Sequence, residues 1–180
     1  MEEPEVPLES VHEHINEHAH HAKQTWVLGV ALSAALLAAI AAVSALLAGH
    51  HANEAVIEQI RATDDWSYYQ AKGVKSGILA SKLELLRALG EEIDAADEKK
   101  LQQYASEQEE IKKEADEKQH AAAAHLHIHT VFARAVTMAQ IAIAVSAIAV
   151  LTRRRNFWYL GLALGAASLW FLLQGFFGFG

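Results

Sequence analysis

The sequence contains no cysteine and only two prolines, and both shortages limit what the chain can be. Without cysteine it can form no disulfide, no thiolate metal site and no thiol redox centre. Pro4 and Pro7 both stand in the first ten residues, so only scattered glycines interrupt helix formation from Val11 onward. Strand signals are also absent, and the net charge of −7 argues against a general nucleic-acid binder. The sequence therefore predicts an all-α protein with no nucleic-acid partner.

The apolar residues make up 52% of the chain and gather in three blocks. Each block is long enough to cross a hydrocarbon core of about 30 Å as a helix that rises about 1.5 Å per residue. The pattern therefore predicts an integral membrane protein with transmembrane helices at residues 25–49, 131–151 and 157–179.

The last two predicted spans are separated by a short basic turn at residues 152–156, which contains Arg153, Arg154 and Arg155. Three consecutive arginines are hard to move across a membrane, so we expect this turn in the cytoplasm. Alternation then places the acidic, His-rich tail at residues 1–24 in the cytoplasm and residues 50–130 outside it. The expected location is the cell inner membrane, with the lipid bilayer as a partner.

The tail is expected to form a helix from Val11, because Ser10 and Glu13 form a Ser-x-x-Glu capping box. Its three histidines, His14, His18 and His21, share one helical face. They are either a metal-ligand set or a solvated face that meets lipid headgroups.

Small residues mark one side of the first predicted span. They recur every three or four positions, a spacing that lets another helix approach closely in lipid. The residues are Ala31, Ala35, Ala38, Ala42, Ala45 and Gly49. We expect this face to support a homo-oligomer, and the alternative is an alanine-rich span with no preferred packing face.

Residues 50–130 are expected to form a long antiparallel helical hairpin that resembles a coiled coil, with Gly90 ending the first arm at the tip. Each arm carries an expected apolar stripe for contact with the other. The first stripe is Val56, Ile60, Ser67, Val74, Ile78, Leu79, Leu83 and Leu86, and the second is Ile93, Leu101, Tyr104, Gln108, Ile111 and Ala115.

The most unusual local sequence is Asp65-Trp66-Ser67-Tyr68-Tyr69-Gln70-Ala71-Lys72. Two interpretations fit it. Its aromatic, acidic and basic side chains form a ligand or partner patch, or they lock the two arms by filling and pairing along a polar seam. The candidate patch residues are Asp65, Trp66, Tyr69, Gln70 and Lys72. No catalytic set of residues stands out.

Histidines flank both membrane ends of the predicted hairpin. His50 and His51 follow the first span, and His125 and His129, four residues apart, precede the second. Imidazoles at that spacing suit Zn²⁺ or another divalent metal, and the alternative is that they are interfacial histidines in helix caps and headgroup contacts.

Few polar residues lie inside the predicted spans. Arg134 and Gln174 fall at one level of an antiparallel pair, which predicts a hydrogen bond between them, and Gln140 is expected to face a neighbouring helix. Gly161 and Gly165 form a GxxxG step suited to close packing.

Several of these motifs resemble a family of small bacterial membrane proteins labelled domain of unknown function 4337. The resemblance rests on Gly49–Ala55, Asp65–Lys72, Gln140–Ile143 and the basic turn before Phe157-Trp158-Tyr159. It implies three membrane spans and brings no activity, ligand or catalytic residue.

These observations favour a non-enzymatic, membrane-anchored scaffold that self-associates through small-residue faces and hairpin seams. The alternative is a metal- or pH-responsive protein, or a small transporter, that uses His50, His51, His125 and His129. A membrane enzyme acting at the Asp65–Lys72 patch is the third hypothesis.

Overall fold

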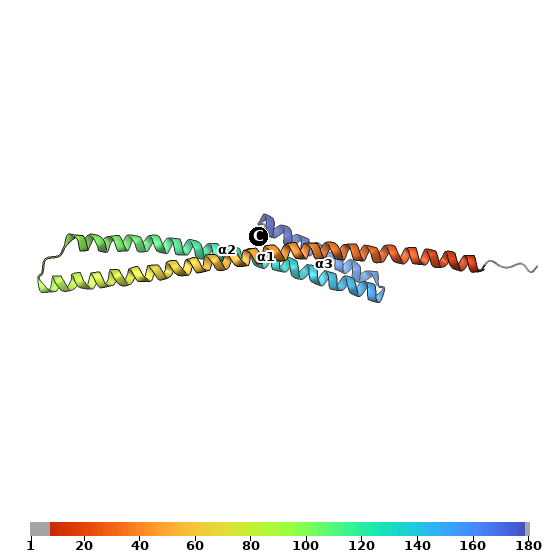
Figure 1. Cartoon of the computed structure of the whole chain (residues 1–180), viewed down its shortest axis with the longest axis horizontal. Helices are drawn as coiled ribbons and strands as arrows, with labels where there is room; N and C mark the ends of the chain where they lie inside the picture. The colour runs from red at the N-terminus through yellow and green to blue at the C-terminus, as the bar shows by residue number, and fades with distance from the viewer. Residues whose placement is uncertain (1–7, 179–180) are drawn as a thin grey trace, which may run out of the picture. The chain divides into compact units, whose positions relative to one another are not determined.

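The computed structural model describes the backbone of residues 8–178 and the side chains of residues 26–178. It contains three helices, α1 (Leu8–Leu89), α2 (Ala95–Thr152) and α3 (Arg155–Phe177) (Figure 1). None of the described residues forms a strand, so the predicted all-α class is confirmed. Each helix also contains a stretch long and apolar enough to cross a membrane.

The chain divides into two compact units. Unit 1 contains Met1–Leu47 and Val131–Gly180, and unit 2 contains Ala48–Thr130. Unit 2 is therefore built from the second part of α1 and the first part of α2, which we call its two arms.

The two arms of unit 2 run antiparallel. Lys118 Nζ donates to Asp65 Oδ2 at 2.5 Å, Lys72 pairs with Glu107, and Lys82 Nζ lies 2.6 Å from Asp97 Oδ2. As the residue number rises along α1, the number of its partner on α2 falls, and Figure 1 shows the arms side by side.

The residues between the arms recur at alternating steps of three and four, which is the heptad spacing of a coiled coil. On α1 the partly or fully buried positions at this spacing are Ala48, His51, Ala55, Glu58, Ala62, Asp65, Tyr69, Lys72, Ser76, Leu79, Leu83 and Leu86. On α2 they are Asp97, Leu101, Tyr104, Gln108, Ile111, Ala115, Lys118, Ala122, His125 and His129. We call this surface the seam. Its buried alanines let the two backbones approach closely.

The apolar stripe predicted on α1 is only partly correct. Leu79, Leu83 and Leu86 face α2, but Val74 and Ile78 are 63% and 67% exposed. Val56, Ile60 and Ser67 are also exposed. The helix carries two stripes of apolar residues. In the stripe that α2 covers, polar residues interrupt the apolar pattern, so that stripe is hard to recognise in the sequence. The stripe predicted on the second arm is partly or fully buried at all six positions, although Ile93 lies in the turn before α2 and the other five lie on the helix.

The turn between the arms ends α1 as predicted. Gly90 adopts a φ of 70°, and Glu91 N–H donates to the Leu86 carbonyl at 3.0 Å, which is a glycine-terminated helix end. On the other side of the turn, Asp94 Oδ1 accepts from Ala96 N–H at 2.8 Å and caps α2.

In unit 1, α3 packs through small residues. Its buried positions are Gly161, Gly165, Ser168 and Leu172. A methyl group at Gly161 would lie 2.5 Å from Ser146 Oγ of α2, and one at Gly165 would lie 2.7 Å from a methyl of Leu37 of α1. The predicted GxxxG step therefore brings α3 close to both other helices.

The small-residue face predicted on α1 is not the face that α1 uses inside unit 1. Val30, Leu37 and Ser44 are buried there, seven residues apart, whereas all six predicted small residues are exposed. Leu37 instead fills the space that the missing side chain of Gly165 leaves open. The described residues therefore leave the predicted face uncovered.

The basic turn is tighter than predicted. α2 continues to Thr152 and α3 begins at Arg155, so only Arg153 and Arg154 lie outside helices. Arg153 adopts a left-handed φ of 54°, and Arg154 N–H donates to the Ala149 carbonyl at 3.2 Å. The Arg155 guanidinium lies 5.9 Å from the centre of the Trp26 ring.

Overpacking the seam should destabilise unit 2. Ala62 and Ala115 are each 0% exposed, so Ala62→Leu should lower the free energy of unfolding by about 1–3 kcal/mol. Ala105→Leu, at an exposed position of α2, is the control and should be nearly neutral. Thermal unfolding followed by circular dichroism in detergent measures the difference, and equal midpoints for the two variants would contradict the packing described.

Candidate functional site

A charged and aromatic cluster lies midway along the seam. Lys72 Nζ donates to Glu107 and lies 5.3 Å and 5.1 Å from the ring centres of Tyr68 and Tyr104. Gln103 Nε2 donates to the other Glu107 oxygen at 2.8 Å. The ammonium group therefore lies between two aromatic rings and a carboxylate, which combines an ion pair with cation–π contacts.

The second cross-arm ion pair joins Asp65 to Lys118. Next to it, the Trp66 and Tyr69 rings meet edge to face with centres 5.5 Å apart. Gln108 Nε2 donates to the Tyr69 carbonyl at 3.4 Å. At this level an ion pair and a hydrogen bond to the backbone cross the seam, and the aromatic pair stands on α1 beside them.

The predicted patch residues do not all converge. Asp65, Tyr69 and Lys72 face α2, Trp66 is half-buried, and Gln70 is exposed. Three of the five lie in the seam, which favours the interpretation that they lock the arms. We call Asp65, Lys72, Glu107 and Lys118 the central lock.

Hydrogen bonds within the central lock favour the charged forms of Lys72, Glu107 and Lys118. The hydrogen bond to Glu107 raises the pKa of Lys72, and the same hydrogen bond lowers the pKa of Glu107. The hydrogen bond to Asp65 likewise raises the pKa of Lys118. Sequence periodicity did not single out Glu107 or Lys118, because nothing in either arm alone fixes its register against the other.

Histidines meet at the end of unit 2 where both arms continue into unit 1, which we call the proximal end. His51 Nδ1 and His125 Nδ1 lie 3.0 Å apart across the seam. His129 Nδ1 donates to the Ala48 carbonyl at 2.8 Å. His50 is exposed, with its ring centre 5.4 Å from that of His51.

The structure thus pairs two of the four predicted metal ligands and gives the other two different environments. Among the described residues, no group of three or more His, Asp or Glu side chains has the geometry of a metal site. The tail histidines His14, His18 and His21 lie outside the described side chains.

Burial and the neighbouring rings of His125 and His50 lower the pKa of His51, and Glu54 opposes them. Two nitrogens 3.0 Å apart form a hydrogen bond only when one carries a proton and the other offers a lone pair. Protonation of both Nδ1 atoms would instead turn two N–H groups toward each other.

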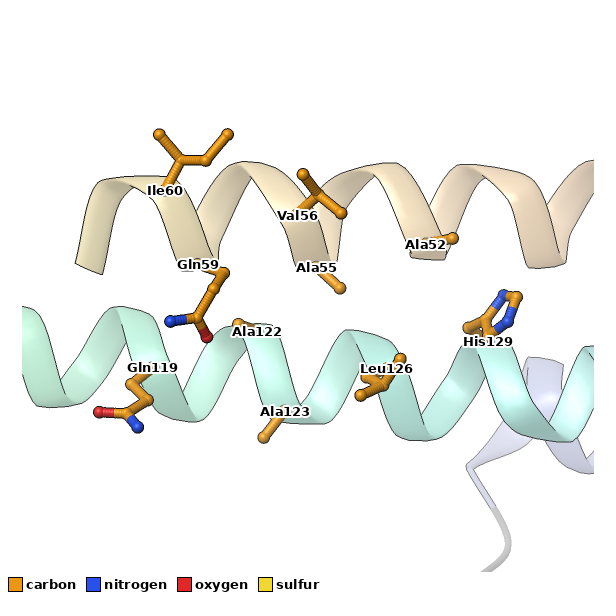
Figure 2. Close-up of a pocket in the computed structure, with 10 residues that line it drawn as sticks. All are labelled: Ala52, Ala55, Val56, Gln59, Ile60, Gln119, Ala122, Ala123, Leu126 and His129. Atoms are coloured by element: carbon orange, nitrogen blue, oxygen red, sulfur yellow. The ribbon is translucent and has the colours of Figure 1, made fainter. Parts of the chain in front are cut away.

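A groove of about 520 Å³ opens along the flank of the arms at the proximal end. In Figure 2, Ala55 and Gln59 point toward α2, while Val56 and Ile60 point away from it. The complete lining is Ala52, Ala55, Val56, Gln59, Ile60, Gln119, Ala122, Ala123, Leu126 and His129. The groove is mainly apolar, so it suits aliphatic side chains better than a charged ligand.

The polar contacts predicted between the last two spans are not formed. Within the described part of the chain, no hydrogen bond joins Arg134 to Gln174. Arg134 is exposed, whereas Ala135 is fully buried and its carbonyl accepts from Ser168 Oγ at 2.7 Å. Adjacent residues point about 100° apart on a helix, so the contact face through Ala135 turns Arg134 away.

Gln140 is also exposed, and that leaves it available to a neighbouring helix. The polar contacts of unit 1 come instead from serines that the sequence did not single out. Besides Ser168, Ser146 Oγ donates to the Ala142 carbonyl at 2.7 Å, and Trp158 Nε1 donates to Ser33 Oγ at 3.1 Å. The serines at positions 146 and 168 stand among small residues at helical spacing, which is the signal that would have found them.

Comparison with known proteins identifies the family. The family model described as domain of unknown function DUF4337 matches residues 26–178, which cover most of both units. This chain belongs to the DUF4337 family. No curated protein and no solved structure matches it. The DUF4337 match therefore supports the resemblance expected from the sequence, and it brings no activity or ligand with it.

Breaking the central lock should weaken unit 2 of this DUF4337 protein. Lys72→Gln removes the ion pair and both cation–π contacts, so it should lower the thermal midpoint more than Lys75→Gln, whose side chain is exposed. The pKa of Glu107 lies below its ordinary value of 4.5. The stabilisation of unit 2 by the ionised carboxylate is therefore complete above that pH and is lost as the pH falls through the lowered pKa. Lys72→Gln should flatten this acid-induced loss, and an unchanged pH profile would contradict the assignment.

The proximal end should lose stability in mild acid. The pKa of His51 is lower in the folded chain than its ordinary value of 6.5, so the unfolded chain takes up the proton first. The contribution of neutral His51 to folding stability is therefore complete above pH 6.5 and falls as the pH decreases through the lowered pKa. Thermal midpoints at pH 7.5 and 5.5 with a chelator present measure the change. His51→Asn should reduce it, and His127→Asn, at an exposed position, should leave it intact.

Proposed function

We propose that this DUF4337 protein is a membrane-anchored helical scaffold that self-associates and catalyses no reaction. One observation carries the proposal. One face of α1 in unit 2 is exposed and nearly uncharged, although the two arms already pack against each other through the seam. The residues of this outer face are Ile57, Ile60, Asp64, Ser67, Ala71, Val74, Ile78, Ser81 and Leu85.

The outer face has the spacing of a second coiled-coil seam. Its members recur at steps of three and four over about eight helical turns, and Asp64 is its only charged residue. The exposed side of α2 is different in kind, because it carries Glu109, Glu110, Lys113 and Glu117. A run of exposed aliphatic side chains on one arm alone is typical of a protein–protein contact.

A second copy of the chain is the partner that fits this face best. Two copies anchored in one membrane with the same orientation present equal faces of equal length, related by a two-fold axis along the membrane normal. The groove beside the proximal end shares Ile60 with the outer face, so a neighbouring helix on that face would also have a hollow to fill. The uncovered small-residue face of α1 suits a second contact within the membrane.

The membrane arrangement follows from the apolar stretches and the basic turn. We propose that the three helices span the inner membrane, that Arg153–Arg155 lie in the cytoplasm, and that residues 50–130 project as a hairpin on the opposite side. The three helices of suitable length and hydropathy support the spans, and the positive charge supports the orientation.

Single-cysteine labelling tests the orientation, because the native chain has no cysteine to give background. In intact cells, an impermeant maleimide should label Ser106→Cys, which is exposed on the arm proposed to lie outside. It should label Asn156→Cys, beside the arginines, only after the membrane is permeabilised. The reverse pattern would refute the proposed topology while leaving self-association open to its own test.

Two opposite substitutions test self-association through the outer face. Val74→Glu introduces a charge into the face and should convert crosslinked or sedimenting oligomers into monomers. Asp64→Asn removes like charges that two parallel copies would bring together, so it should strengthen association. Glu110→Gln on the charged side of α2 is the control and should change nothing.

The oligomeric state is measured by crosslinking in native membranes and by sedimentation in detergent. Wild-type chain that stays monomeric in both would refute the scaffold. If the Val74→Glu variant still forms oligomers, the contact between copies lies on a face other than the outer face.

A further inference from the structure

The His51–His125 pair has a geometry that the scaffold does not require. The two rings come from different helices, yet their Nδ1 atoms lie 3.0 Å apart and their planes differ by 32°. Buried alanines flank the pair in the seam, Ala48 and Ala55 on α1 and Ala122 on α2. The hydrogen bond from His129 to the Ala48 carbonyl joins the arms one turn away. The pair is therefore partly buried and stands beside a second contact between the arms.

We propose that His51 Nδ1 and His125 Nδ1 together bind one divalent transition-metal ion of the copper(II) or nickel(II) type, which joins the two arms at the proximal end. This inference goes beyond the scaffold, because each copy of the chain carries its own pair.

The donor set selects the type of ion. A metal bonds to imidazole nitrogen at about 2.0–2.1 Å, so two nitrogens on one ion lie about 2.9 Å apart at a right angle and about 3.3 Å apart at a tetrahedral angle. The 3.0 Å of the hydrogen-bonded pair lies within this range, so one ion can replace the proton between the rings with little movement of either arm. Two imidazoles completed by water suit the square-planar and tetragonal sites of copper(II) and nickel(II), whereas a structural zinc site takes four protein ligands.

The two imidazoles fill two positions of the metal, and water fills the others. His129 is engaged with a carbonyl through Nδ1, and His50 is exposed, so neither joins the pair in this arrangement. When the ion binds, the ring that carries its proton on Nδ1 shifts to the Nε2 tautomer, so that both Nδ1 atoms offer a lone pair to the metal. Because the ligands come from both arms, a bound ion favours the paired arrangement over any state in which the arms separate.

The test is metal binding by the full-length chain in detergent, with the tail histidines removed as a possible second site. In a background of His14→Asn, His18→Asn and His21→Asn, copper(II) should bind with one saturable site per chain. Its electron paramagnetic resonance spectrum should show coupling to two imidazole nitrogens. Nickel(II) should bind at the same site and zinc(II) at least about tenfold more weakly, in the order expected of such donors.

Matched substitutions assign the site. His51→Asn and His125→Asn should each abolish the saturable site, while His127→Asn should keep it, with helix content checked by circular dichroism. A spectrum without coupling to two imidazoles would overturn the proposal, whether or not the variants fold. So would saturable binding that survives both substitutions, or binding seen only when the tail histidines are present.

The monomeric Val74→Glu variant separates this proposal from the scaffold. If it binds copper(II) as the unsubstituted chain does, the site is complete within one copy. If it loses the site, the pair does not act as proposed, whatever the result for self-association.

Discussion

Close approach of two helix backbones is the constraint on which unit 2 depends. Alanine recurs every seven residues in the seam of α1, at Ala48, Ala55 and Ala62, and meets Ala115 and Ala122 of α2. Side chains this small add little hydrophobic stabilisation per contact, because that term scales with the apolar area removed from water. What they contribute is proximity, and the proximity lets longer polar side chains span the seam.

Both polar features of the seam use that proximity. The central lock closes two cross-arm ion pairs near the middle of the arms, and the His51–His125 pair closes a third contact at the proximal end. A seam filled with leucine would gain more from burial and would hold the helices farther apart. This arrangement gives unit 2 a defined register, because each ion pair can form at only one alignment of the two arms along their length.

Much of this could be predicted from the sequence, and the exceptions have physical reasons. The helical class, the apolar stretches, the Gly90 turn and the stripe on α2 follow from periodicity and turn chemistry. The stripe on α1 was misassigned because that helix has two, and the covered one contains charges whose partners lie on another helix.

Contacts between helices were the least predictable feature. The sequence places Arg134 and Gln174 at one level, but a one-residue difference turns Arg134 away from the face that Ala135 occupies. It also places the histidines at one end of the predicted hairpin without saying which two would meet. The height of a side chain along the helix axis can be found by counting residues. The direction in which it points around the axis matters only once the face covered by the partner helix is known.

The left-handed backbone at Arg153 shows that the conformation of the basic turn and its positive charge favour different residues. Most residues other than glycine pay roughly 1–2 kcal/mol to adopt such a conformation, so the shape of the turn would be easier with glycine there. Arginine at this position adds positive charge to the turn and strains its backbone. Replacing Arg153 with glycine would relieve the backbone and remove a third of the consecutive positive charge. If the proposed membrane orientation then reversed, the lost charge would be the cause, because the turn itself would form more easily.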